Sequence, residues 1–455
     1  MTLQQPQPPA KFFSEWRIIG LILLIGLGLR VGMLHRFWSD LNTDPDVYVA
    51  IAQGLAEGRG YSAPGTDVPT VFRPPLYPLF LVPVSGPDQQ WGRAVLQLLL
   101  SLATLPFIWL TARRLHLSRT GRLLAVTIVA IDPLLLRYVP YPMTETLCAL
   151  LISILLWSLS RQGPATLRHG FLAGLIIGFC VLSRPTFWAF GILLTFAVIW
   201  NRWRDRSFTT QAMAKSGSPA FSNSWGSLLA MGIGIAVCVV PWGVRNLMVM
   251  GTPILMTTHG GYTLLLGNNE AFYEEVVRQP FGTIWDGSHG AGQDAWVKQL
   301  EQEMRSKGIR GEVERDRWMS ARAKETIRRN PDTFLKACWI KFYWFWNIAP
   351  HGSASHALPP VARFGVGLYY TALWLTLITG IVFVLKNLWR DERSFRIWQA
   401  PLLLVIAMTL AHLVYWSDGR MRAPIMPAIA LLAAAIAGFD KTRKSDPREG
   451  QGLSP

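Results

Sequence analysis

The 455-residue chain is 51% hydrophobic and only 16% charged, yet it carries a net charge of +16. Its Lys and Arg residues stand in short segments between long apolar runs, as the positive-inside rule describes for membrane proteins. No basic face interleaved with aromatic residues stands apart from these runs, so the composition argues against a nucleic-acid partner and for the lipid bilayer.

Repeated apolar runs of about 17–25 residues match the thickness of a hydrocarbon core and predict an all-α polytopic membrane protein. The expected spans are 18–36, 92–111, 121–138, 145–160, 168–183, 185–201, 226–245, 363–386, 397–416 and 422–439. Basic residues such as Arg113, Arg161, Arg204 and Lys386 fall in the connections on one side, which predicts that this side is cytoplasmic. Both termini are therefore expected in the cytoplasm.

One aromatic segment leaves the number of spans open. Phe334–Trp346 is apolar but short, and it carries Lys336 and Lys341. We expect an interfacial helix, because its aromatic rings suit the headgroup region and every basic loop then stays inside. Eleven spans instead of ten is the alternative.

The predicted spans divide the chain into four parts. These are an N-terminal transmembrane catalytic module 1–245 with a first outer loop 37–91, an outer region 246–362, C-terminal transmembrane helices 363–440, and a cytoplasmic tail 441–455. Helical patterning within the outer region predicts a small helical domain that lies over the membrane.

Two carboxylates, Asp44 and Asp46, open the first outer loop. The simplest interpretation is that Asp44 caps a helix that begins near Pro45, because proline suits the first helical position. The functional interpretation makes one of the two acids a general base, which must reach the proton that it removes. A carboxylate at a helix start can do both.

The other candidate residues stand at the predicted outer ends of spans, where a membrane-surface active site would gather them. They are Tyr48, Arg73, Tyr77, Glu145, Arg184, Arg245, His259, Arg420 and Arg422. Thr144 and Glu145 also fit a helix cap with an acidic first turn. Arg184 and Arg245 also fit arginines whose side chains extend to the interface. His259 stands in a Gly-rich loop that either approaches a sugar or phosphate or makes turns.

Arg420 and Arg422 run against the charge bias, because they stand on the side where basic residues are depleted. A phosphate group is the simplest partner for them, since guanidinium binds phosphate oxygens in a fork geometry. The sequence has no Walker loop, no dinucleotide-binding glycine motif, no zinc-protease motif and no nucleophile elbow.

These residues stand in motifs that resemble a known family. Asp44-x-x-x-Tyr48, Gly60-Tyr61 and Arg73-Pro74-Pro75-x-Tyr77-Pro78 resemble the first outer loop of GT-C-fold glycosyltransferases, more narrowly family 39 and the aminoarabinose-transferase group. Thr144-Glu145, Ser183-Arg184-Pro185, Pro241-Trp242-x-x-Arg245-Asn246 and Arg420-x-Arg422-x-Pro424-x-x-Pro427 resemble the later landmarks of that group, in the same order.

The resemblance implies a GT-C-like bundle of about ten transmembrane helices with interfacial helices on its outer side. It further implies a bacterial inner-membrane enzyme with a periplasmic active site, which transfers a sugar from a polyprenyl-phosphate carrier to a hydroxyl of a lipid, glycan or protein, with inversion. Asp44 matches the catalytic acid, Asp46 is a supporting candidate, and either Arg420 or Arg422 would hold the carrier phosphate.

The residues are consistent with that chemistry, since a carboxylate base and a phosphate-binding arginine suffice when the leaving group needs no proton. The sequence identifies no certain cofactor, and a divalent cation (Mg²⁺ or Mn²⁺) that bridges carboxylates and phosphate is the alternative. A transporter or flippase, or a polymerase or ligase of lipid-linked glycans, is the competing function.

Overall fold

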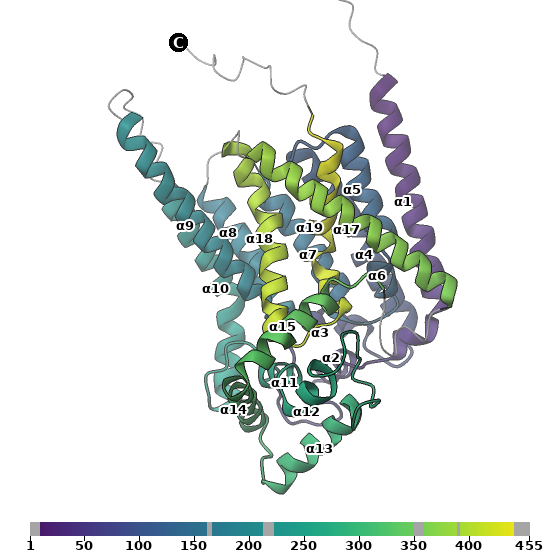
Figure 1. Cartoon of the computed structure of the whole chain (residues 1–455), viewed down its shortest axis with the longest axis vertical. Helices are drawn as coiled ribbons and strands as arrows, with labels where there is room; N and C mark the ends of the chain where they lie inside the picture. The colour runs from purple at the N-terminus through teal and green to yellow at the C-terminus, as the bar shows by residue number, and fades with distance from the viewer. Residues whose placement is uncertain (1–9, 162–165, 213–222, 350–358, 389–391, 441–455) are drawn as a thin grey trace, which may run out of the picture.

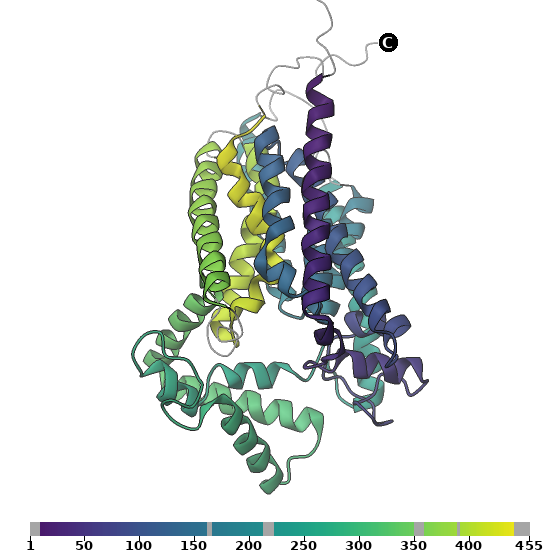
Figure 2. The same cartoon turned by 90° about the vertical axis from the view of Figure 1, so that its right-hand side faces the viewer.

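The computed structural model describes residues 10–161, 166–212, 223–349, 359–388 and 392–440. Within these ranges the chain is helical, and its only β-pairing is two isolated bridges, Ser62 with Pro69 and Leu117 with Phe439. Long helices run roughly side by side in one bundle, and a layer of shorter helices lies across one end of it (Figures 1 and 2). We call this layer, residues 37–89 and 251–349, the outer layer. The predicted tail 441–455 lies outside the described residues.

The bundle contains helices at all ten predicted span positions. The N-terminal part supplies α1 (Ala10–Arg36), α4 (Gln90–Arg114), α5 (Arg119–Ile131), α6 (Pro133–Arg137), α7 (Thr144–Leu159), α8 (Leu167–Ser183), α9 (Phe187–Ala212) and α10 (Asn223–Met250). The C-terminal part supplies α17 (Pro360–Leu388), α18 (Glu392–Val414), a 3-10 turn (Gly419–Ile425), α19 (Met426–Ala434) and a second 3-10 turn (Ala435–Ala437). Asp132 caps α6 and interrupts the third predicted span, because Pro133 cannot continue the hydrogen-bonding pattern of α5.

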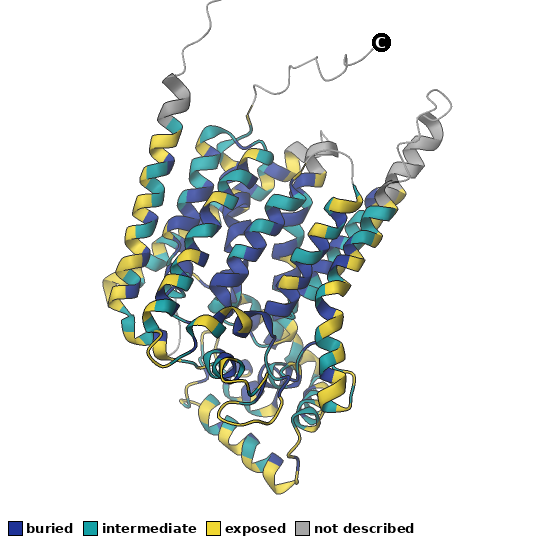
Figure 3. Cartoon of the chain, turned by 180° about the vertical axis from the view of Figure 1, so that it is seen from behind, coloured by how far each residue is buried: buried dark blue, intermediate teal, exposed yellow. Residues whose placement is uncertain are grey.

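Six helical segments of the described chain are long and apolar enough to cross a membrane. They are Glu15–Arg36, Gln90–Arg114, Trp225–Met250, Pro360–Lys386, Arg396–Val414 and Gly419–Ala437, and Thr144–Leu159, Leu167–Ser183 and Phe187–Asn201 are shorter apolar helices. Large apolar side chains such as Leu24, Met248 and Val361 are exposed on the outside of the bundle (Figure 3). These features identify a multi-pass membrane protein, while the number of spans stays a prediction.

Small residues set the closest helix contacts in the bundle. A Cβ atom added at Gly174 of α8 would overlap the carbonyl of Met231 in α10, and one at Gly170 would overlap the carbonyl of Ser227. Glycine is therefore needed at both positions for the two backbones to touch. Every residue of α19, a helix rich in Ala and Leu, is buried between α5, α7, α17 and α18.

The outer layer contains α2 (Tyr48–Ala56), α3 (Leu76–Leu81), α11 (Gly260–Leu266), α12 (Glu270–Phe272), a π-turn (Tyr273–Val277), α13 (Gly292–Ser306), α14 (Glu312–Arg329) and α15 (Pro331–Phe345). The part between α11 and α15 has a hydrophobic core of its own. Phe272, Trp285 and Trp344 pack with Trp416, with ring centroids 5.5–6.2 Å apart among these contacts. Trp416 follows α18, so this core joins the outer layer to the C-terminal end of the bundle.

The aromatic segment that left the span count open forms α15. Its Leu335 and Trp339 are more than 60% exposed, whereas Trp344 packs in the outer core. Lys341 is fully buried, and its ammonium donates to the carbonyls of Gly267 and Val414 at 3.3 and 3.1 Å. An apolar face on a short helix that is otherwise attached to the outer layer supports the interfacial assignment, which stays a prediction.

Candidate functional site

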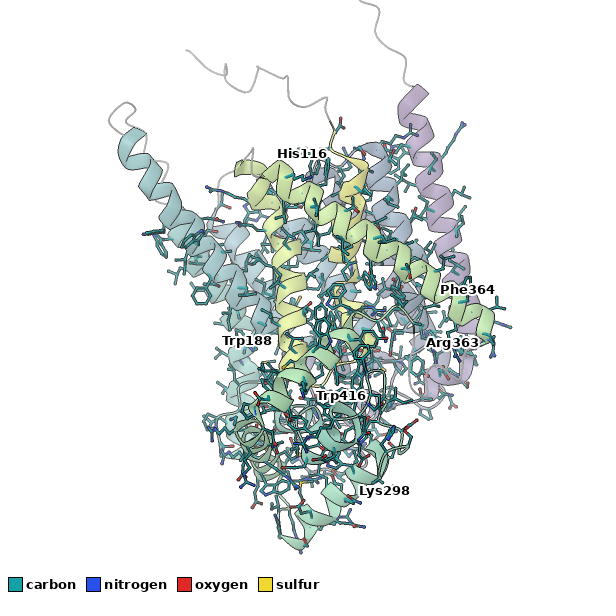
Figure 4. The ribbon with its side chains drawn as sticks, in the orientation of Figure 1. His116, Trp188, Lys298, Arg363, Phe364 and Trp416 are labelled. Carbon is teal, nitrogen blue, oxygen red and sulfur yellow. The ribbon has the colours of Figure 1, made fainter. Side chains whose placement is uncertain are left out.

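The candidate site lies where the bundle meets the outer layer, near Trp416 (Figure 4). Its first element is a tight turn at the start of the first outer loop. The amide of Val47 donates to the carbonyl of Asp44 at 3.1 Å, and Val47 adopts a left-handed conformation with φ 57°. This conformation is unfavourable for a β-branched residue, so the surrounding contacts must hold the turn in place.

The turn delays the helix that the sequence predicts near Pro45. The α2 helix begins at Tyr48 instead, because a residue in the left-handed conformation cannot be part of a right-handed helix. The Asp44 cap expected from the sequence is wrong, since Val47 occupies the cap position without a side-chain bond. Asp44 Oδ2 instead accepts a 2.8 Å hydrogen bond from the amide of Ala50, inside the first turn of α2. Burial raises the pKa of Asp44, although the backbone amides at the start of α2 oppose the shift. Its second oxygen, Oδ1, is buried and has no hydrogen-bond partner among the described residues.

Asp46 has a different environment, because two arginines contact it. Arg73 lies 2.7 Å from its Oδ1 and Arg420 lies 3.3 Å from its Oδ2. The Nε of Arg73 also donates to the backbone carbonyl of Asp46 at 2.9 Å. Burial acts to raise the pKa of Asp46, but Arg420 and Arg73 outweigh it and hold the pKa below its usual range. Asp46 is therefore a charged ion-pair partner, whereas Asp44 is the acid without an arginine contact.

Glu145 forms the second acidic centre, in the first turn of α7. It is 1% exposed, and its Oε1 lies 3.3 Å from Nη2 of Arg184 and 3.4 Å from Nε of Arg420. Arg184 reaches this point because α8 ends at Ser183, and Arg184 is the cap residue between this helix and Pro185. Arg420 consequently contacts Asp46 of the first outer loop and Glu145 of α7 at the same time. The Thr144 cap expected from the sequence is wrong, since Thr144 is the first helical residue and Met143 occupies the cap position without a side-chain bond.

Aromatic residues line the same region. Tyr48 and Tyr77 pack edge to face with ring centroids 5.3 Å apart, and the guanidinium of Arg73 lies 5.5 Å from the centre of the Tyr48 ring. Burial raises the pKa of Tyr48 to about 12, so its phenol stays protonated near neutral pH. The hydroxyl of Tyr77 is buried and has no partner among the described residues.

His259 comes from the Gly-rich outer loop and reaches the site through its aromatic neighbours. Its ring centroid lies 4.7 Å from that of Phe72 and 5.3 Å from that of Tyr262. Burial and the nearby charge of Arg73 lower the pKa of His259 to about 3. The imidazole is therefore neutral near neutral pH, and its Nδ1 has no hydrogen-bond partner in the described part of the chain.

Two of the arginines expected at the site bind backbone carbonyls of the protein instead. Arg422 donates from Nη1 to the carbonyls of Phe345 and Asn347, both at 2.8 Å, and its guanidinium lies 4.4 Å from the centre of the Tyr370 ring. Arg245 donates to the carbonyls of Thr70 and Tyr61, both at 2.7 Å. These contacts occupy donor groups on both side chains, and the structure does not bring them to Asp46 and Glu145.

Sequence reasoning missed Glu312, which fixes the position of the first outer loop. Its Oε2 accepts from Thr70 Oγ1 at 2.7 Å, its Oε1 accepts from the amide of Val71 at 3.0 Å, and Thr258 also donates to Oε1. Glu312 stands in the first turn of α14, a helix start that the sequence did not predict. Nothing in the chain order indicates a contact across 242 residues.

The acids and arginines around Asp44 and Glu145 include four buried polar atoms that form no hydrogen bond with any described residue. They are Asp44 Oδ1, Glu145 Oε2, Arg184 Nη1 and Arg420 Nε. Such atoms are costly in a finished protein interior, and they mark the places where a ligand would complete the bonding. Two donors on arginines suit an anion, and a free carboxylate oxygen suits a hydroxyl group.

The same atoms bear on the divalent-cation alternative. No three His, Cys, Asp or Glu side chains gather as a metal centre within the described ranges. Arginines contact both oxygens of Asp46 and Oε1 of Glu145. A role for Mg²⁺ or Mn²⁺ stays a prediction.

Comparison with known proteins agrees with this architecture. Residues 73–242, less than half of the chain, match the family model of dolichyl-phosphate-mannose-protein mannosyltransferases. No curated protein matches the sequence.

Three solved structures can be compared along most of the chain. The oligosaccharyltransferase AglB from Archaeoglobus fulgidus, in complex with an inhibitory peptide and a dolichol-phosphate, aligns with a TM-score of 0.50 and 14% identity over 94% of this chain and 50% of that one. The apo form of the Archaeoglobus fulgidus oligosaccharyltransferase aligns with a TM-score of 0.49 and 14% identity over 93% of this chain and 50% of that one. ArnT from Cupriavidus metallidurans bound to undecaprenyl phosphate aligns with a TM-score of 0.41 and 12% identity over 90% of this chain and 77% of that one.

The chain spans about half the length of the archaeal enzymes that it matches. The likeness to AglB shows that the fold is GT-C-like, as the sequence motifs predicted. The fold and the family match together support a membrane glycosyltransferase.

Proposed function

We propose that this protein transfers a sugar from a polyprenyl-phosphate carrier to a hydroxyl acceptor, at the end of the bundle that the outer layer covers. The observation that carries the proposal is the pairing of an arginine cluster with a separate carboxylate. Among the described residues, Arg184 Nη1, Arg420 Nε and Asp44 Oδ1 are buried and form no hydrogen bond, although Arg420 Nε lies 3.4 Å from Glu145 Oε1.

The arginine cluster is suited to the carrier phosphate. Arg184 Nη1 and Arg420 Nε would donate to phosphate oxygens, in the planar geometry that guanidinium groups favour. Asp46 and Glu145 hold the two side chains in place, so the donors are positioned before the ligand binds. Of the two arginines that the sequence offered for this role, we assign Arg420, because the Arg422 guanidinium donates to backbone carbonyls.

Asp44 is suited to be the base. Its Oδ1 would accept the proton of the acceptor hydroxyl as that oxygen bonds to the anomeric carbon and the bond from this carbon to the phosphate oxygen breaks. Attack opposite the leaving phosphate inverts the anomeric centre. The phosphate leaves as an anion that the arginines stabilise, so no second acid is required.

The membrane orientation belongs to the same proposal. The basic connection between α4 and α5 contains His116, which lies at the end of the bundle away from Trp416 in Figure 4, and the positive-inside rule assigns that end to the cytoplasm. The candidate site then faces the outside, where a lipid-linked donor and a lipid, glycan or protein acceptor meet.

The transport alternative receives no support from the ionisable residues of the bundle. Arg30 is buried in α1 and donates to Ser101 Oγ at 2.7 Å and to the carbonyl of Ala130 at 2.8 Å. Asp132 accepts from the amide of Leu135 and from the hydroxyl of Tyr370. Both groups are bonded within the protein, as structural charges in membrane proteins are.

The test is mass spectrometry of lipid-linked sugars and surface glycans from cells that carry the wild type, Asp44→Asn or Asp67→Asn. Asp67 is the matched control, since it is an exposed carboxylate of the same loop. We expect Asp44→Asn to lose the glycan product and accumulate the lipid-linked donor at normal protein level. Equal amounts of glycan product from the Asp44 and Asp67 variants would show that Asp44 is not the base.

A further inference from the structure

A second site-like feature lies at the opposite end of the bundle. A cavity of about 580 Å³ opens among the ends of α1, α4 and α7, and its lining includes Trp16, Trp109, Trp157, Arg113, Arg114 and Arg122. His116, which also lines it, lies far from Trp416 in Figure 4. The cavity is therefore separate from the candidate active site.

The tryptophans place the cavity at the membrane interface. Trp16 of α1 packs against Trp109 of α4 with ring centroids 4.9 Å apart, and Trp16 is 46% exposed. Two turns further along α1, Leu24 is 66% exposed on the surface that faces lipid. Tryptophan at the end of apolar helices is typical of the headgroup region, so one wall of the cavity adjoins lipid.

The charges that line the cavity are of two kinds. Arg122 is neutralised, because Glu15 lies 3.0 Å from its Nε and Asp440 lies 3.7 Å from its Nη1. Arg113 is not: its guanidinium forms neither a hydrogen bond nor an ion pair with any described residue, and it lies 4.7 Å from the centre of the Trp109 ring.

Stacking leaves a guanidinium able to bind an anion. The ring contacts the flat face of the group, while the N–H donors point outward in its plane. Arg114 lies 4.3 Å from the centre of the Trp157 ring, but its Nη1 already donates to the carbonyl of Trp157. The cavity thus has two guanidinium groups held against tryptophan faces, and the two carboxylates of its lining are paired with Arg122.

We propose that this cavity binds the phosphate of an anionic phospholipid, with Arg113 as its principal contact and the tryptophan rings beside the glycerol backbone. A lipid is favoured over a soluble phosphate because the cavity is bordered by exposed apolar helix surface and by interfacial tryptophans. A volume of about 580 Å³ is in the range of small-molecule sites and large enough for a headgroup.

The test uses the full chain in nanodiscs of phosphatidylcholine, with and without phosphatidylglycerol, and measures lipid retention by native mass spectrometry. The variants are Arg113→Gln and Arg168→Gln. Arg168 is the matched control, because it is an exposed arginine of a neighbouring connection that does not line the cavity. A parallel arm adds inorganic phosphate to phosphatidylcholine nanodiscs and measures the unfolding temperature.

We expect the wild type to retain phosphatidylglycerol in preference to phosphatidylcholine. Arg113→Gln should weaken this preference roughly tenfold, as the loss of one charge-assisted hydrogen bond does, while Arg168→Gln should keep it. Equal losses in both variants would mean a general attraction of basic loops for anionic lipid and would overturn the site. An Arg113-dependent stabilisation by inorganic phosphate alone would overturn the lipid assignment.

Discussion

Replacing Arg420 with alanine tests the centre of the candidate site. Its Nη1 lies 3.3 Å from Asp46 Oδ2, and its Nε lies 3.4 Å from Glu145 Oε1 but forms no hydrogen bond within the described part of the chain. The substitution therefore removes two ion pairs within the protein and one proposed bond to the carrier phosphate. The first loss affects stability, and the second affects transfer.

The two effects have different sizes. Glu145 is 1% exposed, and after the substitution only Arg184 faces its charge. Breaking one partner from a buried pair costs about 3–5 kcal/mol when the remaining charge is uncompensated, so a cost of about 2–3 kcal/mol is expected here, since Arg184 stays. Removing one donor from the transition state lowers the rate about 10²–10³-fold.

A second substitution separates them. Arg420→Lys keeps a positive charge near Asp46 and Glu145, so this variant should retain most of the stability that Arg420→Ala loses. It should recover little of the transfer rate, because an ammonium group does not replace the planar donor geometry of the guanidinium at the phosphate. Thermal unfolding in detergent measures the first quantity, and the rate of transfer from a polyprenyl-phosphate-linked sugar measures the second.

The reasoning fails if Arg420→Lys regains transfer together with stability. In that case Arg420 would act only by balancing Glu145, and the phosphate would bind elsewhere. Arg420→Ala protein that unfolds like the wild type would likewise contradict the assigned ion pairs.

Three further predictions concern the same region. Because burial raises the pKa of Asp44 and the base must be ionised, the transfer rate should fall on acidification at a higher pH than for an ordinary aspartate. His259, with a pKa of about 3, should add no second transition, so His259→Asn should leave the midpoint of this profile unchanged, and a shifted midpoint would refute the assignment. Glu312→Gln should raise hydrogen exchange at the Val71 amide roughly tenfold or more, since a bond to a charged acceptor is lost, whereas Glu314→Gln, in the exposed part of the same helical turn, should not. Transfer should survive a chelator, because arginines supply the positive charge; a loss that Mg²⁺ or Mn²⁺ restores would favour the divalent-cation alternative.

The bundle was predictable because apolar length and proline positions are local signals. All ten expected spans coincide with helical segments, and Pro133 and Pro185 mark breaks between them. The GT-C-like fold followed from short motifs whose order along the chain carried more information than any one of them.

The site was less predictable, because its contacts join distant segments. Arg420 and Arg422 look alike in the sequence, yet a 3-10 turn directs one toward Asp46 and the other toward the carbonyl of Phe345. The start of α2 was misplaced because the left-handed conformation of Val47 has no sequence signal in a β-branched residue. The contacts of Glu312 with Thr70 and Val71 could not be predicted either, because these residues are far apart in the sequence.

The position of Trp416 has a consequence for how the protein is made. Synthesis proceeds from the N-terminus, so residues 260–346 leave the ribosome long before Trp416, whose ring fills their aromatic core and whose amide bonds to the carbonyl of Thr263 at 3.1 Å. The outer layer consequently stays incomplete until α18 has been inserted. Arg420 follows only four residues later, so the same late step finishes both the core and the candidate site. A chain interrupted before Trp416 has neither.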